Sequence, residues 1–311
     1  MSKIYSITLK HHMLAFGVAA ACWGPPAAAA ALEPAHFTSP QQAVDALVAA
    51  LRADNATALL AVFGSDGQKL VSSGDQVADR QGHAKFVESY RRASHIVRVS
   101  PGKAVLVIDT TQWPFPIPIV FHNGAWQFDT RAGAEEILDR RIGRNELDAI
   151  SACHGYVDAQ RDYAQDLQND KKPLEYAQKF VSTKGMHDGL YWPVKLGEIE
   201  SPIGPQMANA KAEGYAAGPL GESGPYHGYY FKILTRQGAA APGGARDDMA
   251  GSHLTGGFAM IAYPAVYGDS GIMSFIVSQD DIVYQKDLGP GTAAAAAAIG
   301  AFNPDLGWHI P

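Results

Sequence analysis

The sequence predicts an α+β protein, with helices and antiparallel strands in separate stretches of the chain. One observation is an apolar face at helical spacing near the start, at Val44, Leu47, Val48 and Leu51. The other is a later change to short strand-like runs that flank turn dipeptides, of which Asn123-Gly124 is the strongest hairpin signal. Helices followed by hairpins are the order expected of this fold class.

The first of two predicted domains spans residues 36–132. Its first helix starts at Ser39-Pro40-Gln41-Gln42, which supplies a serine cap, a proline at the first helical position and a glutamine three residues after the cap. Two further short helices follow, at residues 59–63 and 84–92. The expected strands are residues 96–100, 104–109, 117–122 and 125–129. This order of helices and strands is similar to that of the cone-shaped NTF2-like domains.

The second predicted domain, residues 133–311, consists of a helix and an antiparallel sheet. Its helix is expected over residues 133–168, with an interruption at Gly143. A short helix is predicted at residues 174–180 and long ordered loops at residues 183–226. The expected strands are residues 228–235, 257–262, 272–277 and 282–286, before an alanine-rich tail.

The first 31 residues have the pattern of a secretion signal. Lys3 and Lys10 precede an apolar run from Met13 to Gly24, and five alanines end at Ala31. The apolar run is shorter than the roughly 20 residues that span a bilayer. We therefore expect a cleaved signal, a periplasmic location and no stable membrane insertion after cleavage.

Cys22 provides a second possibility for the N-terminal segment. It follows three alanines, so a lipid attached to Cys22 would tether the protein to a membrane. Ala19 stands where lipoprotein signals usually have a bulky apolar residue, and the alanine run offers a separate cleavage site, so ordinary cleavage is preferred. Cleavage would leave Cys153 as the one cysteine, and a single cysteine forms no intramolecular disulfide.

The charge of the mature chain excludes one class of partner. Subtracting two signal lysines from 25 basic residues leaves 23, against 31 acidic residues, for a net charge of −8. No basic stripe is evident in the sequence, so nucleic acid is not an expected partner. No cofactor is predicted.

Four segments resemble an exported bacterial family catalogued as domain of unknown function 2950. They are Arg140–Ala164, Trp113–Phe121, Gly228–Gly238 and Gly256–Gly289. The resemblance extends over most of the mature chain, in order. It implies export, and it implies no particular chemistry.

A second resemblance concerns the C-terminal part. Asn145-Glu146-Leu147-Asp148-Ala149-Ile150, closing at Ala159-Gln160, is similar to the corresponding stretch of type IV pilins and pseudopilins. That resemblance implies a pilin-like head, with a long helix under an antiparallel sheet. Charged residues precede the stretch here, where a pilin has its apolar anchor, so a conventional filament subunit is not expected.

Two short motifs suggest a serine nucleophile. Gly268-Asp269-Ser270-Gly271 matches the tetrapeptide of trypsin-like proteases, and Gly221-Glu222-Ser223-Gly224 has His227 nearby. The first lacks a histidine in the required context, and the second lacks the glycine spacing of a nucleophile elbow. A turn and a loop are the preferred interpretations.

His154 and Asp158 lie four residues apart on the predicted helix and suggest two metal ligands. A zinc site needs three or four ligands, and no other His or Cys has ligand spacing, so no metal site is predicted. The charged patch of Arg140, Arg141, Arg144 and Glu146 suggests either an anion site or a tie between the domains, and the tie is favoured.

The sequence therefore favours a non-enzymatic interaction or envelope-assembly protein with an envelope protein as partner. No catalytic residue is assigned. The alternative is a periplasmic hydrolase or small-ligand-binding protein that uses a cleft between the domains. Candidate ligand-binding residues are Arg141, Arg144, Tyr229 and Lys286.

Overall fold

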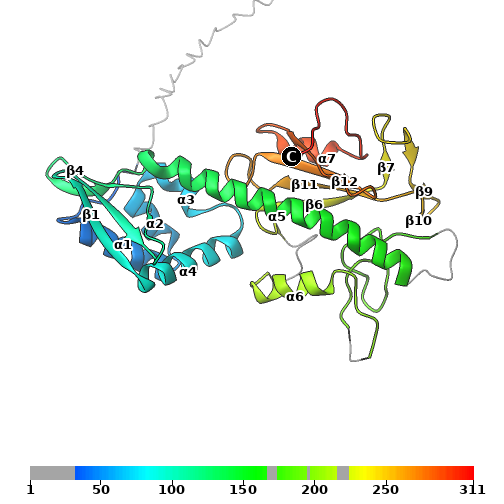
Figure 1. The fold of residues 1–311 in the computed structure, drawn as a ribbon, viewed down its shortest axis with the longest axis horizontal. Coiled ribbons are helices and arrows are strands. Elements are labelled where there is room, and N and C mark those ends of the chain that lie inside the picture. Colours follow the sequence, from blue (N-terminus) through cyan, green and yellow to red (C-terminus); the bar gives the residue numbers. More distant parts are fainter. Residues whose placement is uncertain (1–31, 167–173, 195–196, 216–223) are drawn as a thin grey trace, which may run out of the picture. The chain divides into compact units, whose positions relative to one another are not determined.

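The computed structural model describes residues 32–166, 174–194, 197–215 and 224–311. The predicted signal peptide, residues 1–31 with Cys22, lies outside the described residues, as does Ser223. The described chain has an N-terminal section of helices and a sheet, one long helix, and a C-terminal section built on a second sheet (Figure 1).

The first helix begins as its sequence predicts. The hydroxyl oxygen of Ser39 accepts a hydrogen bond from the backbone N–H of Gln42 at 3.2 Å, and Pro40 is the first helical residue. The Gln42 side chain bonds Thr38, one residue further back than a capping box requires. The helices of this section are α1 (Pro40–Arg52), α2 (Ala56–Phe63), α3 (Gln68–Val71) and α4 (Gln76–Arg92), with a 3₁₀ turn at Ser65–Gly67.

The N-terminal sheet is antiparallel and five-stranded, in the order β1-β2-β4-β5 with β3 paired to β2. Asn123 and Gly124 have φ angles of 49° and 85°, and positive φ at both positions is what a tight type I′ hairpin requires. Helices α1 and α2 pack on the sheet around buried residues such as Leu47, Leu59 and Phe128. The strands are β1 (Ser94–Ser100), β2 (Lys103–Ile108), β3 (Trp113–Pro114), β4 (Ile119–His122) and β5 (Ala125–Phe128).

A single helix of 36 residues, α5 (Arg131–Asp166), continues from one section to the other. The predicted interruption at Gly143 is wrong, because one glycine costs only about 1 kcal/mol in a helix interior and long helical flanks tolerate it. Ile137 packs on the N-terminal core, whereas Ala149 and Tyr156 belong to the C-terminal core. Residues 32–311 form one compact unit, and the division into two domains after residue 132 stays a prediction.

The C-terminal sheet is antiparallel in the order β13-β12-β11-β6. One face carries Phe275 and Met260 into the core that includes α5. The other face carries Ile276 and Ile261 against α7 and Phe302. The elements are β6 (Tyr229–Leu234), β11 (Ala259–Pro264), β12 (Met273–Ser278), β13 (Tyr284–Asp287) and α7 (Thr292–Ala298), with short strands β7 (Arg236–Gln237), β8 (Arg246–Asp247), β9 (Met249–Ala250) and β10 (His253–Leu254).

The predicted helix at residues 174–180 is wrong. Tyr176 instead forms a β-bridge with Leu254, and its backbone N–H donates to the Leu254 carbonyl at 2.8 Å. The buried amide of Gln160 accepts from the Ala177 N–H and donates to the Ala177 carbonyl, each at 2.8 Å. Both backbone groups therefore have tertiary partners, which replace the hydrogen bonds of a helix.

Helix α6 (Gly204–Ala212) lies in the stretch for which only loops are predicted. Pro205 occupies its first turn, and only Met207 and Ala210 are buried, so its apolar pattern is weak. The α+β class and the predicted strands of both sheets are confirmed. Within the described ranges, no helix has both the length and the apolar character that a membrane span needs.

Candidate functional site

Arg141 donates hydrogen bonds to three protein oxygens. Its Nη1 donates to Asp269 Oδ1 at 2.8 Å and to the Lys69 carbonyl at 2.8 Å, and its Nη2 donates to the Leu70 carbonyl at 3.0 Å. These partners come from α3 and from the loop before β12. The geometry matches the interpretation of Arg141 as a tie between sections of the chain, and it leaves little of the guanidinium for a ligand.

The loop that holds Asp269 is the Gly268–Gly271 motif, and it forms a turn. The Gly268 N–H donates to the Gly271 carbonyl at 2.9 Å. The buried Ser270 hydroxyl accepts from the Val266 N–H at 2.9 Å and donates to the Val266 carbonyl at 3.2 Å. Both hydrogen-bonding roles of this hydroxyl are used inside the turn, so the geometry favours the turn interpretation over a nucleophile.

Tyr229 is fully buried at the start of β6, with its ring against Gly271 of the same loop. Its hydroxyl donates to the Met273 carbonyl at 2.9 Å. Burial, and then the nearby Glu146 carboxylate, raise the pKa of the Tyr229 hydroxyl above its ordinary value. Glu146 itself accepts from the Ile272 and Met273 N–H groups at 3.0 Å each. Tyr229 therefore acts as a packing residue that joins β6 to β12.

The other two candidate residues lie elsewhere. Arg144 is exposed on α5 and has no ion-pair partner in the described part of the chain. Lys286 is on β13, paired in register with Ser274, and lines a pocket together with Ile276, whose side chain faces away from α5. The structure thus brings Arg141 and Tyr229 to one loop and places Arg144 and Lys286 apart from them.

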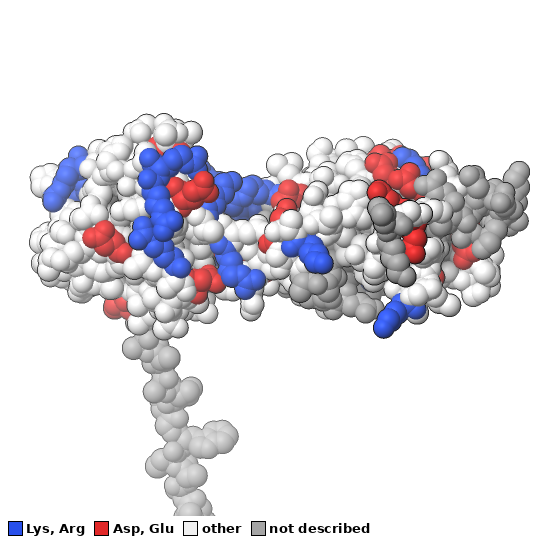
Figure 2. All heavy atoms as spheres, turned by 90° about the horizontal axis from the view of Figure 1, so that it is seen from below, with Lys and Arg blue, Asp and Glu red and all other residues white. Residues whose placement is uncertain are grey.

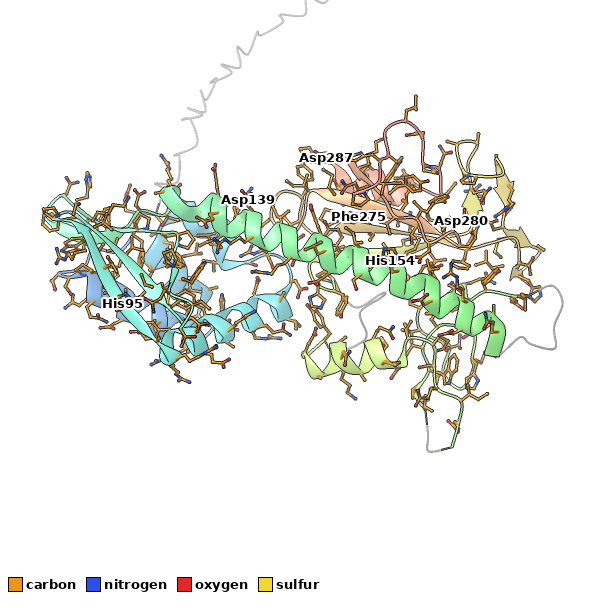
Figure 3. The ribbon with its side chains drawn as sticks, viewed as in Figure 1. His95, Asp139, His154, Phe275, Asp280 and Asp287 are labelled. Carbon is orange, nitrogen blue, oxygen red and sulfur yellow. The ribbon has the colours of Figure 1, made fainter. Side chains whose placement is uncertain are left out.

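His154 lies in the C-terminal half of α5 (Figure 3), and its ion-pair partner is Asp281 and not Asp158. Its Nδ1 is 2.7 Å from Asp281 Oδ1. Asp158 instead lies 3.6 Å from Arg161 Nη1. Among the residues that the structure describes, no group of three or more His, Cys, Asp and Glu side chains is arranged to hold a metal ion.

His227 lies in a cluster that the sequence does not predict. Its Nδ1 is 3.3 Å from Asp148 Oδ2 on α5, and its Nε2 is 3.1 Å from Glu213 Oε2 just after α6. Both contacts are hydrogen bonds only when both ring nitrogens carry hydrogen, since each partner is an acceptor. Burial, followed by Glu213 and Asp148, raises the pKa of Tyr226 to about 12.

The His227 cluster borders a pocket of about 220 Å³ between α5 and α6. The pocket walls include Ser151 and Gln206. The sequence offers no signal for this cluster, because its two carboxylates precede His227 by 79 and 14 residues, one on α5 and the other just after α6. The arrangement fastens α6 to α5.

Strand β1 is exposed at one edge of the N-terminal sheet. It is an edge strand, hydrogen-bonded to β2 on one side and to none of the described strands on the other. Six of its seven residues are exposed, among them Val97 at 41% and Val99 at 59%. Val99 falls in a β-bulge, so the regular part of the strand is Ser94–Arg98. We refer to Ser94–Arg98 as the β1 edge.

The part of the chain that contains the β1 edge is rich in basic residues. Residues 76–103, which span α4, β1 and the start of β2, hold six basic and two acidic residues, although the whole chain has a net charge of −6. Figure 2 shows Lys and Arg side chains gathered on the left-hand part of the surface, which belongs to the N-terminal section. The six basic residues are Arg80, Lys85, Arg91, Arg92, Arg98 and Lys103.

The fold and its two sheets form the background for a comparison with known families. The family model described as "Protein of unknown function (DUF2950)" matches residues 35–310. The chain belongs to this family. No curated protein and no solved structure matches this chain.

The match to DUF2950 starts just before α1 and ends at the last residues of the chain. Both sheets, α5 and the β1 edge therefore lie within the DUF2950 region. The predicted boundary after residue 132 falls inside that region, after the second residue of α5.

Proposed function

We propose that this DUF2950 protein is an exported, non-enzymatic interaction protein of the cell envelope, which binds an extended acidic segment of a partner protein along the β1 edge. The observation that carries this proposal is the exposed edge strand flanked by cations. The signal-like residues 1–31 support export and a periplasmic location.

An extended segment is the partner that an open strand edge fits. The outer N–H and C=O groups of β1 have no neighbouring strand among the described residues. A peptide that adds as another strand would satisfy these groups, which is how β-augmentation gains affinity. Val97 and Ile96 alternate across β1, so an added strand would place its own apolar side chains beside them.

The basic residues near β1 favour an acidic partner segment over a second copy of the chain as the occupant of the β1 edge. Arg98 lies within the β1 edge, with its guanidinium over the Trp126 ring, and Arg91 and Arg92 immediately precede the edge. Pairing β1 with β1 of a second copy would bring these cations near their own counterparts, at an electrostatic cost. Aspartate or glutamate side chains on the partner segment would turn the same cations into attractive contacts and speed the encounter.

We propose in addition that the C-terminal section is a pilin-like head. Helix α5 packs on one face of the β13-β12-β11-β6 sheet, which is the arrangement that the pilin resemblance implies. In this proposal the helix-and-sheet unit serves as a rigid support for the N-terminal section. The hydrolase alternative gains no support from Ser270, whose hydroxyl is used within its turn.

Site-specific photo-crosslinking tests the interaction. A photoreactive residue placed at Val97 is expected to crosslink to an envelope protein through an extended acidic segment, identified by mass spectrometry of the linked peptide. The matched control is Val194, which has the same exposed fraction of 41% and lies in a loop. Arg98→Glu should reduce the Val97 crosslink at least several-fold, and added salt should weaken it.

Three outcomes would overturn this proposal. Crosslinks to a second copy of the chain would assign the β1 edge to self-association. Equal crosslinking from Val97 and Val194 would show that the β1 edge has no special affinity. Linked peptides without acidic residues, or an Arg98→Glu variant that crosslinks as well as the native chain, would contradict the charge argument.

Cell fractionation tests the location separately. The full chain with its native N-terminus should appear in the fraction released by osmotic shock, shortened at its N-terminus. Cys22→Ser should leave this behaviour unchanged, because cleavage near Ala31 removes Cys22. Release that depends on changing Cys22, with the native protein held in the membrane fraction, would instead identify a lipoprotein.

A further inference from the structure

A second pocket lies on the face of the C-terminal sheet that is turned away from α5. It has a volume of about 290 Å³, at the small end of the range for ligand pockets. Strand β13 forms one side, and the chain after α7 forms the other. The lining residues are Ile276, Lys286, Leu288, Ile299, Gly300, Ala301, Asn303, Asp305 and Trp308.

We infer that this pocket binds a small monocarboxylate with an apolar body, through Lys286 and Trp308. The chain near its C-terminus is fixed beside β13, since Gln285 and His309 exchange backbone hydrogen bonds of 2.7 and 3.1 Å. This bridge holds Trp308 next to Lys286, whose Nζ is 5.8 Å from the centre of the indole ring. Figure 3 labels the neighbouring Asp287, at the end of β13.

The ammonium of Lys286 has hydrogens available for a ligand. No acceptor among the described residues lies within hydrogen-bond distance of its Nζ, and Asp305 Oδ1 is 3.8 Å away. Lys232 on the same sheet face provides the contrast. Its Nζ donates to the carbonyls of Ala296, Ala297 and Ile299 at 2.7, 3.0 and 2.7 Å, at the end of α7. All three N–H donors of Lys232 are thus bound to backbone carbonyls, whereas the Lys286 ammonium lines the pocket with donors available.

The other residues that line the pocket favour a ligand with an apolar body and a single negative charge. Ile276, Leu288 and Trp308 give it apolar walls, which suit a hydrocarbon or aromatic body. The Asp305 carboxylate offsets part of the Lys286 charge, so a ligand with one negative charge fits better than a dianion. Asn303 uses its Oδ1 to accept from the Ala240 N–H at 2.9 Å, which leaves its Nδ2 hydrogens for a carboxylate oxygen.

Gly307 keeps the ammonium at the pocket. A Cβ at this position would meet both Nζ and Cε of Lys286. The absence of a side chain at residue 307 therefore lets the lysine lie against the chain near Trp308. Gly307→Ala is expected to displace Lys286 and to weaken carboxylate binding without removing any charge.

The test is a titration of the protein, produced from the full chain, followed by NMR of the Trp308 indole N–H. Phenylacetate and hexanoate are the probes, with benzyl alcohol, hexylamine, acetate and succinate as comparisons. The two monocarboxylates should shift the Trp308 signal in a saturable way. The neutral, cationic, short and dianionic compounds should bind at least ten-fold more weakly.

Variants separate the role of Lys286 from a general effect of charge. Lys286→Met should lower the affinity for phenylacetate at least ten-fold, and Lys286→Arg should restore most of it. Lys184→Met, at an exposed loop lysine, is the matched control and should have no effect. Trp308→Leu should weaken binding of both probes, read from the shifts of neighbouring backbone signals.

Saturable binding that Lys286→Met leaves unchanged would overturn the inference. So would equal binding of hexylamine, or the absence of saturable binding by either monocarboxylate. The pocket and the β1 edge are on different sheets, so each proposal stands or fails without the other.

Discussion

Arg141 and Asp269 form an ion pair of 2.8 Å in which their side chains are only 14% and 8% exposed. They lie 128 residues apart in the sequence. The same guanidinium also donates to the Lys69 and Leu70 carbonyls of α3. One side chain of α5 therefore binds both the N-terminal section and the loop that leads into β12. A pair this well buried persists only because each charge has its hydrogen-bonding partners.

Removing the Arg141 charge should destabilise the protein strongly. Arg141→Met is expected to cost about 3–5 kcal/mol, since it leaves Asp269 buried without its cation. The exposed neighbour Arg144 supplies the control, and Arg144→Met should stay within about 0.5 kcal/mol. Urea unfolding followed by circular dichroism measures both values. Similar losses from the two variants would show that the Arg141 contacts do not hold the fold together.

Asp269 should make the stability depend on pH. Burial raises the pKa of its carboxyl above the ordinary value, although Arg141 and Lys69 oppose the shift. The folded state then binds a proton at Asp269 more tightly than the unfolded state does. This protonation stabilises the folded protein fully below about pH 4, and the stabilisation is lost as the pH rises through the folded pKa of Asp269. Asp269→Asn should remove this part of the pH dependence.

Arg141→Met also tests the link between Asp269 protonation and stability, by removing the partner of Asp269. Without its cation, the pKa of the Asp269 carboxyl should rise further, which extends the loss of stability to higher pH. Unfolding free energies between pH 4 and pH 7 should therefore fall more steeply for Arg141→Met than for the native chain. The double variant with Asp269→Asn should lose the added slope. A native and an Arg141→Met profile that run parallel would contradict this account.

Asp75 makes a second long-range link. Its buried carboxylate accepts from the Val77 and Ala78 N–H groups at the start of α4 through Oδ1, at 3.0 Å each. Through Oδ2 it accepts from the Tyr215 hydroxyl and the Gly228 N–H, also at 3.0 Å each. One residue thus caps a helix of the N-terminal section and fastens the chain at the entry to β6.

Asp75→Ala should therefore cost more than the loss of a helix cap. The matched control is Asn55, whose side chain caps α2 through the Ala58 N–H alone. Asn55→Ala is expected to cost about 1 kcal/mol. Asp75→Ala should cost about 3 kcal/mol, because it also removes the acceptor of two buried donors, the Tyr215 O–H and the Gly228 N–H. Equal costs in denaturant unfolding would mean that only the cap matters.

Local features of the fold were predictable from the sequence, and long-range ones were not. The Ser39 cap and the Asn123-Gly124 hairpin are specified by residues close together in the chain. The partners of Asp75 and Arg141 come from distant elements, so no spacing indicates them. Strand β1 was predicted, whereas its place at the edge of the sheet depends on how all the strands pair.

The failed predictions have the same origin. Residues 174–180 have a composition that favours a helix, but Gln160 and Leu254 provide partners for their backbone groups. Among the candidate site residues, Arg141 and Tyr229 proved to be bound within the fold, and Lys286 lies in a pocket. The sequence identifies which side chains carry charge, and only the fold decides which of them meet an opposite charge.

Two glycines of α5 test whether this helix is one rigid element. Nothing lies within 4 Å of the position that a Cβ on Gly143 would occupy, whereas a Cβ on Gly133 would collide with the backbone of Pro116 and Ile117. Gly143→Ala should stabilise the protein by about 0.5–1 kcal/mol, because alanine loses less backbone entropy in a helix. Gly133→Ala should destabilise it by about 1–3 kcal/mol through overpacking. Thermal unfolding compares the two. A loss of stability from Gly143→Ala would contradict the continuous, unobstructed helix that the structure shows through residue 143.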